Sequence, residues 1–161
     1  MSRLHLTVAA VVERHGRFLV VEELAGGREV INQPAGHVEP GESLRDAVIR
    51  ETREETAWAF EPVAISGVYL WEHPEKAERF LRVVFCGNCS DHDADQALDD
   101  GILRALWLSR QELEERGPQL RSPMVLRAID DFRNGSRYPV NMFQHIDTEV
   151  LAAHAQVVLS S

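Results

Sequence analysis

One segment limits the possible folds of this chain more than any other: residues 36–58, GHVEPGESLRDAVIRETREETAW. It begins with a loop that contains glycine and proline, and it continues as a strongly charged run. Ser43 is a suitable helix N-cap, and Asp46 stands three residues later in the capping-box position. The pattern therefore predicts a helix from about Leu44 to Thr56.

The glutamates of this expected helix lie on the same face as its apolar residues. At about 100° per residue, one arc of roughly 120° carries both groups. A carboxylate face that only met solvent would lie opposite the apolar stripe and would not extend it. The members of this arc are Leu44, Ala47, Val48, Glu51, Glu54, Glu55 and Trp58.

Carboxylates at positions i, i+3 and i+4 repel one another and destabilise an isolated helix. Facing the protein body, they would also raise one another's pKa unless they were neutralised. Arg50 could orient one of them, but a single guanidinium does not balance three carboxylates. Hard divalent cations such as Mg²⁺ or Mn²⁺ would, since they prefer oxygen ligands. The alternative is a surface helix with charge pairs such as Arg50–Glu54, which leaves the continuous stripe unexplained.

The rest of the chain reads as strands followed by short helices. The runs 4–13 and 17–24 are rich in strand-forming residues and predict a hairpin. Ser109 and Ser122 each predict the start of a helix, the first through Glu115 and the second to about Asn134. Because strands and helices do not alternate regularly, the pattern indicates an α+β fold or an α/β/α sandwich around a mixed sheet. The other expected strands are 29–33, 65–72, 79–87 and 103–109, with 34–42 and 90–101 as loops.

Length and composition are typical of one globular domain. The chain has 161 residues, 44% of them apolar, so we expect a single domain over 1–161, with 136–161 as a C-terminal extension or tail. No stretch approaches the ~18 apolar residues needed to cross a bilayer, and the N-terminus lacks a cleavable signal pattern. We therefore expect a soluble, cytoplasmic protein without a membrane partner.

The charge and the cysteines exclude some further classes. A net charge of −9 disfavours nonspecific binding to nucleic acid or anionic lipid, although metal ions could still let such a chain bind a polyphosphate. Cys86 and Cys89 are too few for a disulfide framework. Since no second cysteine pair follows, we interpret them as two thiols at a strand end rather than as part of a zinc site.

Residues 36–58 resemble the signature of the Nudix hydrolases, G-x5-E-x7-R-E-U-x-E-E-x-G-U, where U is a bulky apolar residue. The chain departs from it at Thr52, where the family prefers an aliphatic residue, and at Ala57, where the family has glycine. We expect a slight effect at Thr52 and a different helix end at Ala57, and neither change removes an oxygen ligand. The matching positions are Gly36, Glu42, Arg50, Glu51, Glu54 and Glu55.

Four further motifs resemble one bacterial phosphatase branch of this family, over residues from about 5 to 142. The resemblance implies a Nudix-type α/β/α sandwich and Mg²⁺-dependent hydrolysis, with Mn²⁺ as a possible substitute. For this branch it implies release of orthophosphate from nucleoside tri- and diphosphates and from the pyrophosphates of thiamine and its hydroxymethylpyrimidine precursor. The motifs are NQPAGH at 32–37, RFLR at 79–82, LRSP at 120–123 and RYP at 137–139.

The resemblance also implies residue roles. Glu51, Glu54, Glu55 and the Gly36 carbonyl are expected metal ligands, and Arg50 is expected to orient Glu51. Glu54 is the first candidate for the general base that activates water, which makes Glu54, Glu51 and Arg50 the expected catalytic set. The alternative base is an acidic residue of a later loop, Asp99 or Asp100.

Candidates for substrate contact come from other segments. Arg79 and Arg82 are three residues apart in an expected strand, so they should point to opposite faces and at most one should reach a phosphate. Trp71 could stack on a base or thiazolium ring, although such residues usually belong to the core. His37 follows Gly36 directly, and Arg121 precedes a helix N-terminus that could attract an anion.

Two other functions remain open from the sequence. A pyrophosphohydrolase would cut internally and give a nucleoside monophosphate from ADP-ribose, a dinucleotide or a nucleoside triphosphate. A ligand sensor with the same fold would be expected to lose one or more of the glutamates, whereas all are present. The expected partner is a small phosphorylated molecule and not nucleic acid, and the oligomeric state is predicted to be monomer or homodimer.

Overall fold

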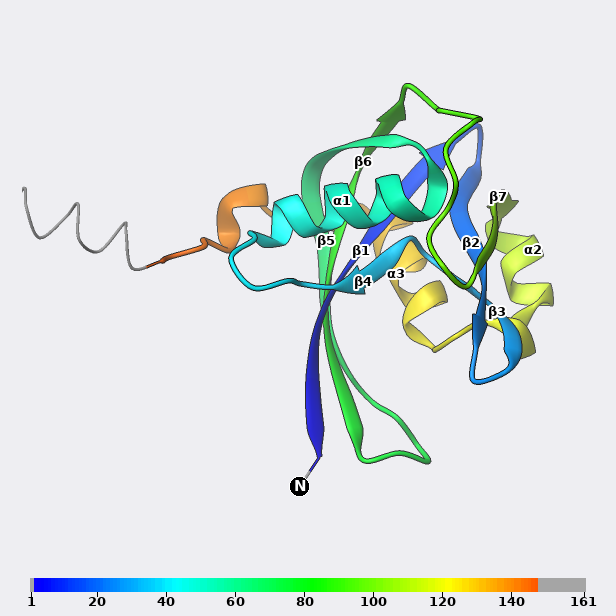
Figure 1. Ribbon diagram of the computed structural model, residues 1–161, viewed down its shortest axis with the longest axis horizontal. Helices are drawn as coiled ribbons and strands as arrows, with labels where there is room; N and C mark the ends of the chain where they lie inside the picture. Colours follow the sequence, from blue (N-terminus) through cyan, green and yellow to red (C-terminus); the bar gives the residue numbers. More distant parts are fainter. Residues whose placement is uncertain (1, 148–161) are drawn as a thin grey trace, which may run out of the picture.

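The structure, a computed structural model, describes residues 2–147. Within them, seven strands form a mixed sheet in the order β3-β2-β1-β6-β5, with β4 paired to β1 and β7 paired to β2 (Figure 1). β1 and β6 run parallel, and the other pairs are antiparallel. The strands are β1 (Arg3–Arg14), β2 (Arg17–Ala25), β3 (Arg28–Asn32), β4 (Ala35–His37), β5 (Ala59–Glu72), β6 (Glu78–Ser90) and β7 (Ile102–Ser109).

Helices cover both faces of the sheet, as the α/β/α class requires (Figure 1). Helix α1 (Leu44–Thr56) packs on one face, where Val8, Ala47 and Val48 are fully buried in one core cluster. Helices α2 (Arg110–Glu115) and α3 (Met124–Arg133) cover the opposite face, which holds the second cluster. Strand β1 supplies apolar residues to both clusters, because a central strand is buried on both sides. The predicted α+β class and mixed sheet are confirmed.

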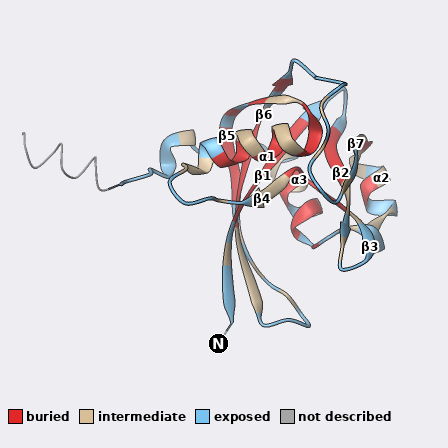
Figure 2. Ribbon diagram, viewed as in Figure 1, coloured by how far each residue is buried: buried red, intermediate tan, exposed pale blue. Residues whose placement is uncertain are grey.

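Burial is uneven along the sheet. Figure 2 shows the buried residues where α1 and α3 cover it, whereas the ends of β1, β5 and β6 near the N-terminus are exposed or half-buried. Short 3₁₀ helices, η1 (Gly117–Gln119) and η2 (Val140–Met142), complete the described elements. Across residues 2–147, no helix is long and apolar enough to span a membrane.

Most predicted elements are confirmed, with three differences. Strands β5 and β6 are longer than expected. Helix α3 begins after Pro123, one residue later than the sequence indicated, and the Ser122 hydroxyl accepts a hydrogen bond of 3.3 Å from the Met124 N–H at its start. Residues 35–37 were expected to be part of a loop but form β4, whose residues pair with Thr7, Val8 and Ala9. The expectation of a loop was wrong because the pairing is long-range, and it matters because β4 holds two candidate site residues.

The two cysteines lie within β6. Cys86 and Cys89 are buried free thiols in opposite core clusters, as two apolar residues of a strand can be.

The segment 136–147 is mostly irregular, and Tyr138 bridges to Ile65 of β5. The rest of the expected C-terminal extension, residues 148–161, lies outside the described residues.

The end of α1 corrects one expectation. Ala57 adopts φ 60° and ψ 13°, so the helix ends in a left-handed residue even though glycine is absent there. Its N–H donates to the Arg53 carbonyl over 2.9 Å, which satisfies a terminal carbonyl of the helix. The expected change of helix end is therefore wrong, and the alanine carries the strain instead.

Replacing Ala57 by Gly should raise the free energy of unfolding by about 0.5 kcal/mol. Glycine removes the left-handed strain of roughly 1–2 kcal/mol, while the loss of a buried methyl and the looser unfolded chain offset part of it. Urea unfolding curves would measure the change. The control Ala47→Gly, in the middle of α1, should destabilise by about 1 kcal/mol or more. Destabilisation by Ala57→Gly as well would contradict the strain argument.

Candidate active site

The carboxylate face of α1 lies against β4. Gly36 pairs with Val8 of β1, and its backbone runs beside the side chain of Glu51. A Cβ at residue 36 would overlap the Glu51 carboxyl group, so only glycine leaves room for this close approach. One helix turn further, Glu55 accepts a hydrogen bond of 3.0 Å from the Ala35 N–H. The carboxylates of α1 and the backbone of β4 thus form one oxygen-rich surface, which we call the carboxylate edge.

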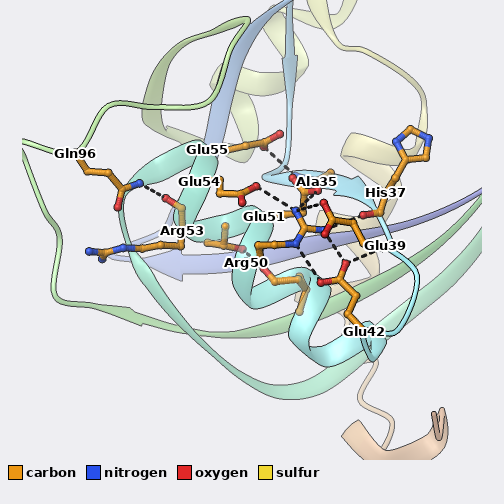
Figure 3. Close-up of polar contacts among 12 residues, drawn as sticks. Ala35, His37, Glu39, Glu42, Arg50, Glu51, Arg53, Glu54, Glu55 and Gln96 are labelled. Carbon is orange, nitrogen blue, oxygen red and sulfur yellow. Dashed lines mark hydrogen bonds and ion pairs between the residues drawn. The ribbon is translucent and has the colours of Figure 1, made fainter. Parts of the chain in front are cut away.

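Arg50 holds this edge together (Figure 3). It donates to both Glu42 carboxylate oxygens, at 2.7 and 3.1 Å, and to Glu51 and Glu54 at 2.9 and 3.1 Å. A further bond of 3.1 Å reaches the His37 carbonyl. One guanidinium therefore links the loop, β4 and three carboxylates. The bidentate bond to Glu42 is the geometry that makes such pairs strong.

The Glu42–Arg50 pair should make stability depend on pH. Arg50 lowers the pKa of Glu42 below its ordinary value of 4.5, chiefly through its hydrogen bonds. A lowered folded-state pKa adds stability above pH 4.5 that is lost as the pH falls through the folded value. Glu42→Gln should therefore destabilise by about 1–2 kcal/mol at pH 7 and by much less near pH 3.

Urea unfolding at the two pH values would measure this difference. The control Glu39→Gln should have little effect at either pH, because its side chain is 66% exposed and lies 3.8 Å from Arg50. An equal loss at pH 7 and pH 3 in Glu42→Gln would show that the pair does not act through its charge.

Burial perturbs two of the helix carboxylates. Glu51 and Glu55 are only 8% and 6% exposed. Burial raises the pKa of Glu51, against the opposing effect of Arg50, and raises the pKa of Glu55 to about 9 despite the Ala35 N–H. The protein therefore keeps carboxylates in a place that disfavours their charged form. A bound cation would reverse that preference.

The donor set fits a hard divalent cation. The Glu51, Glu54 and Glu55 side chains and the Gly36 carbonyl offer oxygen atoms only, which suits Mg²⁺ or Mn²⁺ rather than zinc. In residues 2–147, no three acidic, histidine or cysteine groups already converge on a point that could hold a metal. Glu51 and Glu54 turn toward Arg50 and Glu55 toward Ala35, so binding requires these carboxylates to reorient.

The acidic loop 91–101 lies beside the exposed side of this edge. The Asp99 N–H donates to the Glu54 carbonyl over 2.9 Å, and Gln96 donates to the Arg53 carbonyl over 2.7 Å. The charge of Asp99 contributes to the raised pKa of Glu51. Asp99 and Asp100 both line a pocket that includes Glu54. The structure thus places both alternative bases next to the first candidate.

A second pocket, of about 120 Å³, opens on the other side of β4. Three of the candidate substrate residues, His37, Arg82 and Arg121, line it, whereas Arg79 and Trp71 do not. Arg79 lies on the opposite face of β6, and Trp71 packs on the Phe80 ring at 5.6 Å. The lining residues are Thr7, Glu23, Asn32, Ala35, Gly36, His37, Phe80, Arg82 and Arg121.

The two arginines of this pocket differ in their hydrogen-bond partners. Arg121 binds Glu23 at 2.8 Å, so it meets an acidic partner as well as lining the pocket. Arg82, 5% exposed, donates to the neutral Asn32 side chain over 3.1 Å. Burial, together with the charge of Arg121, lowers the pKa of Arg82 to about 10.

Four residues that the structure brings to these sites had no role predicted from the sequence. Glu42 stands in the matched signature, which could have indicated its partnership with Arg50. Asn32 opens the motif at 32–37, and Glu23 is the second of two adjacent glutamates that follow the apolar run of β2. Thr7 carries no such signal, because its position becomes informative only when β1, β4 and β6 are paired.

Comparison with known proteins agrees with this fold. The family model described as the NUDIX domain matches residues 3–128. The chain therefore belongs to the Nudix hydrolase family and is a Nudix phosphohydrolase.

The chain is also similar to particular members of the family. The chain is 39% identical over 142 residues to "Phosphatase NudJ" of Escherichia coli K12 and of Shigella flexneri, covering 88% of this chain and 92% of each relative. It is 40% identical to a solved Nudix hydrolase from Nitrosomonas europaea, with a TM-score of 0.88 over 91% of this chain and 99% of that one. A MutT Nudix hydrolase from Burkholderia pseudomallei, 21% identical with a TM-score of 0.68 over 80% of this chain and 98% of that one, shares the fold.

Proposed function

We propose that this chain is a metal-dependent phosphatase of the cytoplasm that removes the terminal phosphoryl group from small pyrophosphates. The proposed substrates are nucleoside tri- and diphosphates and the pyrophosphates of thiamine and hydroxymethylpyrimidine, and the product is orthophosphate. The observation that carries the proposal is the intact carboxylate edge against Gly36, where burial disfavours charge unless a cation is present. The 39% identity to the NudJ phosphatases supports the choice of bond.

Each residue of the edge has a proposed task. Glu51, Glu54, Glu55 and the Gly36 carbonyl would hold Mg²⁺ or Mn²⁺, which when bound lowers the pKa of water and neutralises charge on the polyphosphate. Glu54 would accept the proton of the attacking water, since its side chain is 44% exposed and the most open of the three.

Other residues would assist these. Arg50 would fix the position of Glu51 through the bond of 2.9 Å without touching substrate. Asp99 or Asp100 would be the alternative base, because both line a pocket with Glu54 and the Asp99 N–H donates to the Glu54 carbonyl. His37, Arg82 and Arg121 would face the substrate from the pocket beyond β4.

A panel of substrates tests the proposed function. Purified protein with Mg²⁺ would be incubated with ATP, GDP, thiamine pyrophosphate and ADP-ribose, and every product would be identified by anion exchange. Orthophosphate from the first three, with ADP-ribose intact, is the expected result. Pyrophosphate from ATP, or AMP from ADP-ribose, would assign the chain to the enzymes that cut internally. No product from any of the four would indicate a ligand sensor.

A further inference from the structure

The pocket beyond β4 is built around three neighbouring side chains. Thr7 of β1 is paired with His37 of β4 on one side and with Arg82 of β6 on the other. Paired residues of adjacent strands project to the same face of a sheet, with the strands about 4.8 Å apart. All three residues line the pocket, and in Figure 3 the His37 ring points away from Arg50.

Two buried groups in this pocket have no partner among the described residues. They are the Thr7 hydroxyl and the Arg82 Nε, in residues that are 4% and 5% exposed. Leaving such a group unpaired costs about 1–3 kcal/mol, and folded proteins do so rarely. Both groups can donate a hydrogen bond. A ligand with acceptor oxygens would satisfy both at once.

The charge of the pocket specifies the ligand further. Glu23 forms an ion pair with Arg121 at 2.8 Å. The neutral Asn32 side chain lies between Glu23 and Arg82: its amide N–H donates to Glu23 over 3.4 Å, and its amide oxygen accepts from Arg82 over 3.1 Å. The charged lining groups are thus two guanidiniums and one carboxylate, which leaves one positive charge in excess. Such a site favours an anion. Its 120 Å³, room for about four waters, suits one phosphoryl group rather than a nucleoside.

We propose that Thr7 and Arg82 bind the phosphoryl group next to the one that is removed, the group that stays on the organic product. This assignment rests on the proposed function. Ala35 and Gly36 line the pocket and also contact Glu55 and Glu51, so the pocket adjoins the carboxylate edge and a diphosphate could place one phosphoryl group in each. The pocket then makes the enzyme selective for substrates with at least two phosphoryl groups.

Anion binding without metal tests the site apart from turnover. Binding of pyrophosphate and of orthophosphate would be measured by calorimetry in EDTA for the wild type, Thr7→Val, Arg82→Met and Arg82→Lys. Thr7→Val should weaken pyrophosphate binding about tenfold, and Arg82→Met should weaken it by more. The affinity of Arg82→Lys should lie between those of the wild type and Arg82→Met. The control Arg28→Met, which removes an exposed charge of β3, should bind as the wild type does.

Thr7→Val also separates a ligand role from a structural one. Because the hydroxyl has no partner in the free protein, its loss should leave the melting temperature unchanged or higher. In hydrolysis of GDP, kcat/KM should fall about tenfold with most of the loss in KM, since the group binds away from the reacting phosphorus. A lower melting temperature together with wild-type pyrophosphate binding would overturn the proposal.

The remaining outcomes separate a failure of the phosphoryl-binding pocket from a failure of the proposed phosphatase activity. Wild-type hydrolysis combined with unchanged binding in Thr7→Val and Arg82→Met would refute the pocket and leave the phosphatase intact. Binding that depends on Thr7 and Arg82 in a protein without turnover would support the pocket and refute the phosphatase. Dependence seen with orthophosphate but not with pyrophosphate would refute the assignment to a substrate group, because the site would then hold free orthophosphate.

Discussion

Glu54→Gln should lower kcat for orthophosphate release by about 10²- to 10⁴-fold, the range expected for loss of a general base. The amide keeps the size of the side chain but can neither accept the proton of water nor bind a hard cation as a carboxylate does. The fold should survive, because the Glu54 side chain is 44% exposed and its bond to Arg50 is one of several on that guanidinium. Rates at saturating GDP and Mg²⁺ would measure the effect.

The control for this substitution is Glu75→Gln, which removes one exposed carboxylate from the turn between β5 and β6. It should keep wild-type rates and wild-type Mg²⁺ dependence. If Glu54→Gln also kept both, the proposed site would be refuted. If Glu54→Gln kept its Mg²⁺ affinity but Asp99→Asn lost the rate instead, the base would be Asp99.

Gly36→Ala should lower kcat/KM by about 100-fold while the protein stays folded. The added Cβ would meet the Glu51 carboxyl group, the mobile end of a side chain, so the clash is relieved by moving that carboxylate. Displacing a ligand by about 1 Å is enough for a loss of this size. Isothermal titration with Mn²⁺ should show weaker metal binding, and circular dichroism should show an unchanged fold.

Gly117→Ala is the matched control, because a Cβ at that residue would have no neighbour within 4 Å and its φ is not in the left-handed region. It should leave both metal binding and rate as in the wild type. Wild-type Mn²⁺ affinity in Gly36→Ala would mean that the contact between Gly36 and Glu51 does not shape the site.

The helix that carries the glutamates could be predicted to the residue, because its signals are local. Ser43 accepts a hydrogen bond from the Asp46 N–H, and the helix runs from Leu44 to Thr56 as expected. Its end could not be predicted in the same way. Whether Ala57 adopts a left-handed conformation depends on the tertiary structure around a residue that is 2% exposed.

The carboxylate edge follows from local sequence, whereas the pocket depends on long-range strand pairing. Glu51, Glu54 and Glu55 lie on adjacent helix turns, so spacing alone brings them together. Strand β4 has only three residues and directly follows Pro34, and its pairing with β1 spans 26 residues of sequence or more. The position of Thr7 between His37 and Arg82 follows from that pairing and from the parallel register of β1 and β6.

In the proposed reaction, water attacks the terminal phosphorus at the carboxylate edge. Hydrolysis of ADP in water enriched in oxygen-18, with Mg²⁺ present, tests it most directly, because AMP and orthophosphate form whichever phosphorus is attacked. Mass spectrometry of both products would locate the label. Attack at the terminal phosphorus would place oxygen-18 in the orthophosphate and none in AMP. Label in AMP would contradict it, since water would then have attacked the internal phosphorus.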